Sequence, residues 1–286
     1  MSIHTFGASA RFDSARALTE DEMRTHAPSI FATEPHSSRS YRFHAIPTWE
    51  ILKGLIANGF HPVRVTQSTT RDPGKRDFTK HMIRLRRLDN LKALTVGDTI
   101  FEIGLRNAND GTAAYELLAG LLKIRCLNGL FVDNGTFEPV KVRHTGDVES
   151  KVIEGTYRVL NEAEHVLAAP QDWSQIQLNR DERLALAEQA HFVRFADSDG
   201  NVSTPIQPAQ LLIARRPEDQ ATDLWQTFNN LQENAVRGGL TARGVNSTGH
   251  RQRFTSREVK GIDQDLKLNK ALWALTARMA EIKAAA

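Results

Sequence analysis

The 286-residue sequence predicts an α+β fold, with an antiparallel β-meander in the N-terminal half and helices in the C-terminal half. Three observations predict it. Apolar and polar residues alternate between residues 60 and 106, as they do in half-buried strands. Asp-Gly and Asn-Gly turn signals follow at 109–111 and 133–135. After residue 146 the apolar residues recur every three or four positions instead, which is typical of one face of a helix.

These changes of pattern divide the chain into three segments. Residues 1–46 are polar and turn-rich, and we expect them to be largely irregular. Residues 47–146 are expected to form the antiparallel β-rich core. Residues 147–286 are expected to form a helical region that packs on the same core and carries a basic loop at 237–260. The strand–helix alternation of a doubly wound nucleotide-binding sheet does not occur in the sequence.

The first helix and strands follow from local signals. Pro47 suits a first turn and Gly59 a C-terminal stop, so a helix is predicted between them. The runs 60–68, 80–88 and 98–107 alternate and predict strands, and the charged Pro-Gly turn at 69–77 joins the first two.

Two hairpins are predicted next. The Asp110-Gly111 turn indicates that 112–120 return as a strand. A helix over the same residues stays open, because the leucines between 117 and 122 also fit a 3.6-residue period. A second turn at Asn134-Gly135 is expected to join two alternating runs within 130–144.

The C-terminal half carries helical signals. Asn179 followed by Glu182 is typical of a capping box that opens a helix. The stretches 208–216 and 219–237 are expected to be helical, and so is the chain after Asp263. An apolar stripe on this last helix, from Leu268 to Ile282, is expected to be core.

The composition of the chain indicates the cellular compartment in which the protein is expected. A single cysteine, Cys126, allows no internal disulfide, which fits a reducing cytoplasm. No apolar run approaches the ~20 residues of a membrane span, and no signal peptide is visible, so no membrane partner is expected.

The sequence favours no catalytic centre. Cys126 lies among Leu122, Ile124 and Leu130, an apolar setting that predicts a buried structural cysteine. The histidines show no metal-ligand spacing, and neither phosphate-binding glycine motif occurs, so no metal and no cofactor are predicted. We therefore expect a non-enzymatic protein. A metal-dependent nuclease stays open as a third hypothesis, with candidate ligands Asp98, Glu102 and Glu138.

Two basic segments flank an acidic middle. Residues 71–92 carry eight Lys or Arg, 147–234 carry fifteen acidic against seven basic residues, and 235–260 are basic again. If folding brings the basic segments together, they form an electropositive groove for phosphates, with Phe254 stacking on an unpaired base. Solvated surface charge is the alternative. The cations expected at phosphates are Arg71, Lys75, Arg76, Arg84, Arg86, Arg87, Arg237, Arg243, Arg251, Arg253, Arg257 and Lys260.

Three stretches carry a resemblance to a known family. They are N-x-N-D-G-x-x-A-Y-x-L-x-x-G-L-x-x-x-x-C-x-N-G-L at 107–130, LWQTFNNLQENAVRGG at 224–239 and REVKGIDQDLKLNKALW at 257–273. In these the chain resembles the phage- and plasmid-associated family called domain of unknown function 932 (DUF932). The chain departs from the family pattern at Asn109, where histidine is usual, and at Leu127, where serine is usual. The first departure weakens a catalytic role for position 109. The motif positions expected to be architectural are Asn107, Asp110, Gly111, Tyr115, Gly120, Cys126, Asn128 and Gly129.

The resemblance implies a role in mobile-element DNA metabolism or host conflict. We expect a nucleic-acid-binding protein that binds or anneals single-stranded DNA. The alternative is a protein-interaction factor in anti-restriction or host-defence conflict. Expected partners are single-stranded DNA, a host or element-encoded protein, and a further copy of the chain.

Overall fold

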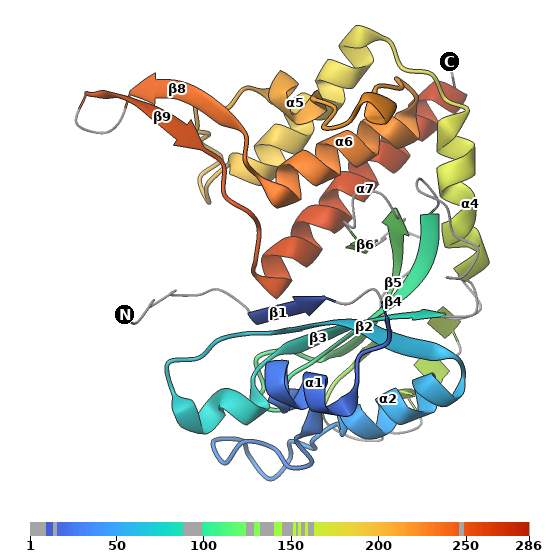
Figure 1. The fold of residues 1–286 in the computed structure, drawn as a ribbon, viewed down its shortest axis with the longest axis vertical. Helices are drawn as coiled ribbons and strands as arrows, with labels where there is room; N and C mark the ends of the chain where they lie inside the picture. Colours follow the sequence, from blue (N-terminus) through green and yellow to red (C-terminus); the bar gives the residue numbers. More distant parts are fainter. Residues whose placement is uncertain are drawn as a thin grey trace. The chain divides into compact units, whose positions relative to one another are not determined.

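The computed structural model describes residues 10–13, 16–87, 99–123, 129–131, 140–144, 151–152, 154–155, 158–159, 163–245 and 249–285. The chain divides into two compact units. The first comprises Met1–Val132, Phe137–Val166 and Lys260–Ile262, and the second comprises Asp133–Thr136, Leu167–Val259 and Asp263–Ala286. An antiparallel sheet dominates the N-terminal half and helices dominate the C-terminal half, which confirms the α+β fold (Figure 1).

The sheet of the first unit is a meander. Its neighbouring strands follow chain order and pair antiparallel: β1 (Ala10–Asp13), β2 (Phe60–Gln67), β3 (His81–Arg87), β4 (Thr99–Asn107), β5 (Tyr115–Lys123) and β6 (Gly129–Phe131). The leucine-rich run that also fitted a helix is therefore a strand. It pairs with β4 from Thr99↔Lys123 to Arg106↔Glu116, because the Asp-Gly turn returns the chain alongside that edge.

The second predicted hairpin is wrong. β6 pairs with Gly120–Leu122 of β5, and β7 (Val140–Val142) pairs with Tyr115–Leu117 of the same strand. In the described residues the two short strands do not pair with each other. The nine-residue β5 is long enough to offer main-chain partners to both along one edge. The Asn134-Gly135 turn lies outside the described residues.

One face of the sheet forms the core of the first unit. Val65, Ile83, Leu105 and Leu117 lie side by side in register on four strands, and each is fully buried. The helices α1 (Glu20–His26) and α2 (Thr48–Ala57) lie against the sheet in Figure 1, with the short 3₁₀ helices η1 (Pro28–Phe31) and η2 (Pro73–Phe78) nearby.

The N-terminal segment is more regular than expected. α1 begins after Thr19, whose side chain accepts a hydrogen bond from the Glu22 amide while the Glu22 carboxylate accepts one from the Thr19 amide. This capping box satisfies two amides that the first helical turn leaves without partners. α2 confirms the helix predicted after Pro47.

The second unit is built from helices around an aromatic core. α4 (Ala163–Ser174), α5 (Arg180–Phe195), α6 (Leu224–Arg237) and α7 (Ile262–Ala284) are its long helices, with the 3₁₀ helices η4 (Pro208–Leu212) and η5 (Pro217–Asp219). Trp173 and Trp273 have ring centroids 4.3 Å apart, and Trp225 and Phe228 have centroids 5.5 Å apart. The predicted capping box at Asn179 and Glu182 is confirmed as the start of α5.

Two expectations about this unit need correction. The predicted helix at 208–216 is only the short η4, which Pro208 opens. The predicted basic loop at 237–260 contains a β-hairpin, formed by β8 (Thr241–Val245) and β9 (Arg251–Thr255). Along α7, Leu268 and Leu272 are buried as expected, whereas Ile282 is half exposed. Within the described part of the chain, the helices fall short of the length and apolarity needed to cross a membrane.

Candidate nucleic-acid interface

The β8–β9 hairpin carries a row of arginines on one face. Arg243 lies directly opposite Arg253, and Arg251 lies opposite Val245 at the next position on the same face. All three arginines are exposed. Figure 1 shows the two strands projecting away from α5 and α6 of the same unit, so we call the hairpin the arm.

The opposite face of the arm packs inward. Residues two apart on a strand share a face, so Ala242, Gly244 and Phe254 lie opposite the arginines. A Cβ added to Gly244 would come within 2.9 Å of both the Phe254 ring and Pro205. Phe254 is therefore half-buried against the second unit and does not lie beside the arginines. The expectation that Phe254 stacks on a base next to the arginine phosphate contacts is not supported by this arrangement.

The arginines of the arm have no acidic partners among the residues that the structure describes. In the described residues no carboxylate pairs with Arg243, Arg251 or Arg253. Two like charges directly opposite on paired strands repel each other and destabilise the hairpin. A polyanion lying along this face would relieve that repulsion, and it would receive charge-assisted hydrogen bonds from the guanidinium groups.

The base of the arm is held firmly. Arg215 Nη2 donates to the Gly238 carbonyl at 2.5 Å, and its Nε donates to Asn234 Oδ1 at 2.8 Å. Arg194 donates from Nη2 to the Arg257 carbonyl at 2.8 Å and from Nε to the Ala235 carbonyl at 2.8 Å. Burial lowers the pKa of both guanidinium groups below its ordinary value. The arm therefore leaves α6 in a defined direction.

Replacing Gly238 by alanine is expected to destabilise this base. Gly238 has φ +65°, ψ −146°, a conformation that side chains other than glycine rarely adopt. An added Cβ would lie 2.6 Å from the backbone of Ser256 and Arg257, which cannot move without displacing β9. We expect the free energy of unfolding to fall by roughly 3 kcal/mol or more, measured by urea denaturation.

Gly239 provides the matched control. It also has a positive φ, +80°, but an added Cβ would meet no atom within 4 Å. Gly239→Ala is therefore expected to cost only about 1 kcal/mol, from backbone strain alone. Equal losses for the two variants would show that the close contact at Gly238 does not fix the arm.

Two of the predicted phosphate contacts lie inside the first unit. Arg84 and Arg86 are 2% and 8% exposed. Arg84 Nη1 donates to Glu102 Oε2 at 2.9 Å, and Arg86 Nε donates to Glu102 Oε1 at 2.5 Å. Both arginines pair with one fully buried carboxylate of the neighbouring strand. The expectation that they contact phosphates is therefore corrected: they form a buried ion-pair network.

Glu102 is ionised at this position. Burial alone raises the pKa of its carboxyl, but the positive charges of Arg84, Arg86 and Arg64 outweigh burial and hold the pKa below its ordinary value. Arg64 lies directly opposite Arg84 on β2. On the same face of the sheet, Glu116 pairs with Arg106 and, at 3.3 Å, with Lys141.

The remaining predicted cations lie on the surface of their own units. In the first unit Arg71, Arg76, Arg87 and Lys260 are exposed, and Lys75 is half-buried. In the second unit Arg257 is exposed and Arg237 pairs with Glu233 at 2.7 Å. The two basic segments thus belong to different units, and a shared groove stays a prediction.

The Asn-Asp-Gly signature anchors the chain before α2. Asn107 Nδ2 donates to the Ile46 carbonyl at 3.1 Å and to Thr48 Oγ1 at 2.9 Å. Asn109 Oδ1 accepts from the Ile46 amide at 3.2 Å. These contacts join residues more than fifty positions apart, so the motif has a structural role here.

The turn itself explains two further positions. Asp110 Oδ1 accepts hydrogen bonds from the amide and hydroxyl of Thr112, at 3.0 and 2.6 Å. Gly111 has φ +80°, which favours glycine. Tyr115 is fully buried, and Gly120 lies opposite Glu102. Cys126 and Asn128 lie outside the described residues, and of Gly129 only its place in β6 is described.

Carboxylates and histidines do not gather into a metal site in the part of the chain that the structure describes. Glu102 is occupied by two arginines, and Asp98 and Glu138 lie outside the described residues.

Sequence reasoning missed a buried polar network around His81. Its Nδ1 lies 2.9 Å from Ser29 Oγ, and its Nε2 lies 3.0 Å from Thr48 Oγ1. Burial lowers the pKa of His81 to about 3, so the imidazole is neutral near pH 7. The only local signal was a histidine at an apolar-face position of a predicted strand.

Comparison with known proteins agrees with the resemblance seen in the motifs. The family model described as Domain of unknown function (DUF932) matches residues 35–273. UPF0380 protein YafZ of Escherichia coli (strain K12) is 41% identical over 270 residues, which cover 94% of each chain. UPF0380 protein YfjQ of the same organism is 40% identical, also over 270 residues and 94% of each chain. No solved structure matches the chain. By the extent of these matches, the chain belongs to the DUF932 family.

Proposed function

We propose that this protein is a nucleic-acid-binding protein of a mobile element that acts in the cytoplasm and takes single-stranded DNA along the β8–β9 arm. The observation that carries the proposal is the set of exposed arginines on one face of the arm, Arg243, Arg251 and Arg253, none of which has an acidic partner among the described residues.

The geometry supports contacts to phosphates rather than to bases. Three guanidinium groups on one face of a two-stranded ribbon present a line of charge-assisted donors to a sugar–phosphate backbone. Phe254, the aromatic side chain of β9, lies on the other face. Binding is therefore expected to depend weakly on base sequence and strongly on salt.

The experiment compares wild-type protein with the variant Arg243→Gln/Arg251→Gln/Arg253→Gln. Affinity for a 30-nucleotide single-stranded DNA is measured by fluorescence anisotropy at a series of salt concentrations. We expect affinity at low salt to fall roughly 10- to 100-fold. The slope of log K against log salt should decrease in magnitude by about 2, since each lost phosphate contact on a single strand removes about 0.7.

A charge-matched control separates the arm from net charge. The variant Lys53→Gln/Lys267→Gln/Arg278→Gln removes three exposed cations from other surfaces and is expected to bind almost as wild type does. If both triple variants lose affinity equally, the arm has no special role. If the wild-type protein does not bind DNA at low salt, the proposed function is wrong.

The two alternatives make different predictions in the same assay. A nuclease would shorten the oligonucleotide in magnesium, although Glu102 is held by Arg84 and Arg86 and is poorly placed to bind a metal ion. A protein-interaction factor would leave the DNA unbound and retain host proteins after nuclease treatment of a lysate.

A further inference from the structure

A cavity in the first unit is lined by residues that take no part in the proposed arm contacts. It has a volume of about 270 Å³ and lies where the end of α1, the start of η1, the loop after β2 and η2 meet. This volume is close to the lower end of the range for small-molecule sites, about 300 Å³. None of the residues that line the cavity is acidic.

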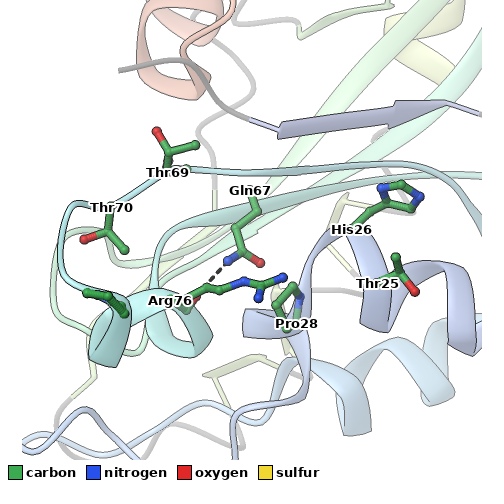
Figure 2. Close-up of a pocket in the computed structure, with 9 residues that line it drawn as sticks. Thr25, His26, Pro28, Gln67, Thr69, Thr70 and Arg76 are labelled. Carbon is green, nitrogen blue, oxygen red and sulfur yellow. Dashed lines mark hydrogen bonds between the residues drawn. The ribbon is translucent and has the colours of Figure 1, made fainter. Parts of the chain in front are cut away.

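Arg76 supplies the charge of the cavity. Figure 2 shows its side chain extending from η2 across the cavity, so that the guanidinium group lies between Gln67 and Pro28. Among the described residues no carboxylate pairs with this guanidinium group. The nearby Asp72 is engaged in its own turn, because its Oδ1 accepts a hydrogen bond from the Gly74 amide at 2.9 Å.

The backbone that carries Arg76 is anchored to the core. Gln67 Nε2 donates to the Arg76 carbonyl at 2.7 Å, which is the dashed line in Figure 2. Gln67 Oε1 accepts in turn from the amide and hydroxyl of Ser29, at 3.1 and 2.9 Å. Ser29 is fully buried and contacts His81. Hydrogen bonds through a buried network fix the position of a binding group before its ligand arrives.

Ser68 and Thr70 also line the cavity. The Ser68 hydroxyl has no hydrogen-bond partner in the described structure, and Thr70 Oγ1 accepts from the Asp72 amide, which leaves its own proton free to donate. The planar guanidinium group of Arg76, in a lining without a carboxylate, matches the acceptor oxygens of a phosphate group.

We infer that this cavity binds a phosphate group through Arg76. The phosphate comes either from a free nucleotide or from the end of a nucleic-acid strand. The cavity is lined on several sides, which suits a phosphate with one substituent better than one within a continuous strand. Only the strand-end form of this inference rests on the proposed nucleic-acid function.

Calorimetry with small probes tests the inference on the full-length protein. Inorganic phosphate and thymidine 5′-monophosphate are expected to bind with dissociation constants of about 1 mM or tighter, and thymidine is expected not to bind. Arg76→Gln should weaken phosphate binding about 10- to 100-fold, the usual effect of losing a hydrogen bond to a charged group. Arg76→Lys, which keeps the charge but not the planar donor pair, should recover part of the affinity.

Arg71→Gln is the matched control, because Arg71 lies in the same exposed turn but does not line the cavity. It should bind phosphate as wild type does. The inference is overturned if phosphate does not bind to the wild-type protein, if thymidine binds as well as its monophosphate, or if Arg76→Gln binds phosphate normally.

Two further measurements identify the source of the phosphate and separate this inference from the proposed function. A wild-type preference for a 5′-phosphorylated over a 5′-hydroxyl oligonucleotide, lost in Arg76→Gln, assigns the site to a strand end. Monophosphate binding without that preference assigns it to a free nucleotide. The triple arm variant should retain phosphate binding while it loses DNA affinity. Each proposal can therefore be refuted while the other stands.

Discussion

Glu102→Ala is expected to lower the free energy of unfolding by about 3–5 kcal/mol. The substitution removes the carboxylate that Arg84 and Arg86 both contact, at 2.9 and 2.5 Å, and both arginines are at least nine-tenths buried. A buried charge that loses its counter-ion keeps its desolvation cost without the attraction that offset it. Urea denaturation followed by circular dichroism measures the loss.

The exposed pair Glu50–Lys53 provides the control. Its nitrogen–oxygen distance is 2.6 Å, but its side chains are 59% and 51% exposed. Water and salt screen such a pair, so Glu50→Ala should cost at most about 1 kcal/mol. Replacing Glu102, Arg84 and Arg86 together by apolar residues of similar volume should recover most of the lost stability. A cost for Glu102→Ala no larger than that for Glu50→Ala would refute this account of the network.

The protein is also expected to lose stability below pH 6.5 because of His81. The ordinary pKa of histidine is 6.5, and burial lowers that of His81 to about 3 in the folded state. Between these values the unfolded chain binds a proton that the folded chain does not bind. Stability is therefore complete above about pH 6.5 and is lost as the pH falls toward 3. At about 1.36 kcal/mol per pH unit, the loss between pH 6.5 and pH 5 is about 2 kcal/mol.

The contribution of His81 is isolated by His81→Gln, measured as the difference in pH dependence from wild type. The difference is needed because burial also lowers the pKa of His144. The variant should be less stable at pH 7, since it disturbs contacts with Ser29 and Thr48, but its stability should fall less between pH 7 and 5. Nuclear magnetic resonance gives a direct test on the wild-type protein: an imidazole signal of His81 that titrates near pH 6.5 would disprove the prediction.

Local signals predicted the sheet well. The Asp110-Gly111 turn decided that Tyr115–Lys123 is a strand, because a tight turn returns the chain to an edge that already offers main-chain partners. The capping boxes at Thr19 and Asn179 have the same local origin, but only the second was recognised from the sequence. The predicted pairing of β6 with β7 is not observed, because both strands pair with β5 instead. A turn signal gives no information about such a third strand.

The candidate sites were less predictable, because they combine distant residues. The cavity around Arg76 joins residues 25–28 to 67–76, and the hydrogen bonds that anchor it join Ser29, Gln67 and His81. No spacing in the sequence indicates such a set. The arm is an intermediate case: its arginines were expected at phosphates, but their ribbon geometry was not.

The sequence by itself determined the α+β class, the strand at 115–123 and the helices after Pro47 and Asn179, since periodicity, caps and turns act over a few residues. Only the tertiary structure decided which arginines are available to a ligand. Arg84 and Arg86 alternate on β3 much as Arg251 and Arg253 alternate on β9, yet the first pair is buried against Glu102 and the second is exposed. Alternation fixes which side chains share a face of a strand, whereas the burial and charge of that face depend on neighbours brought there by the rest of the fold.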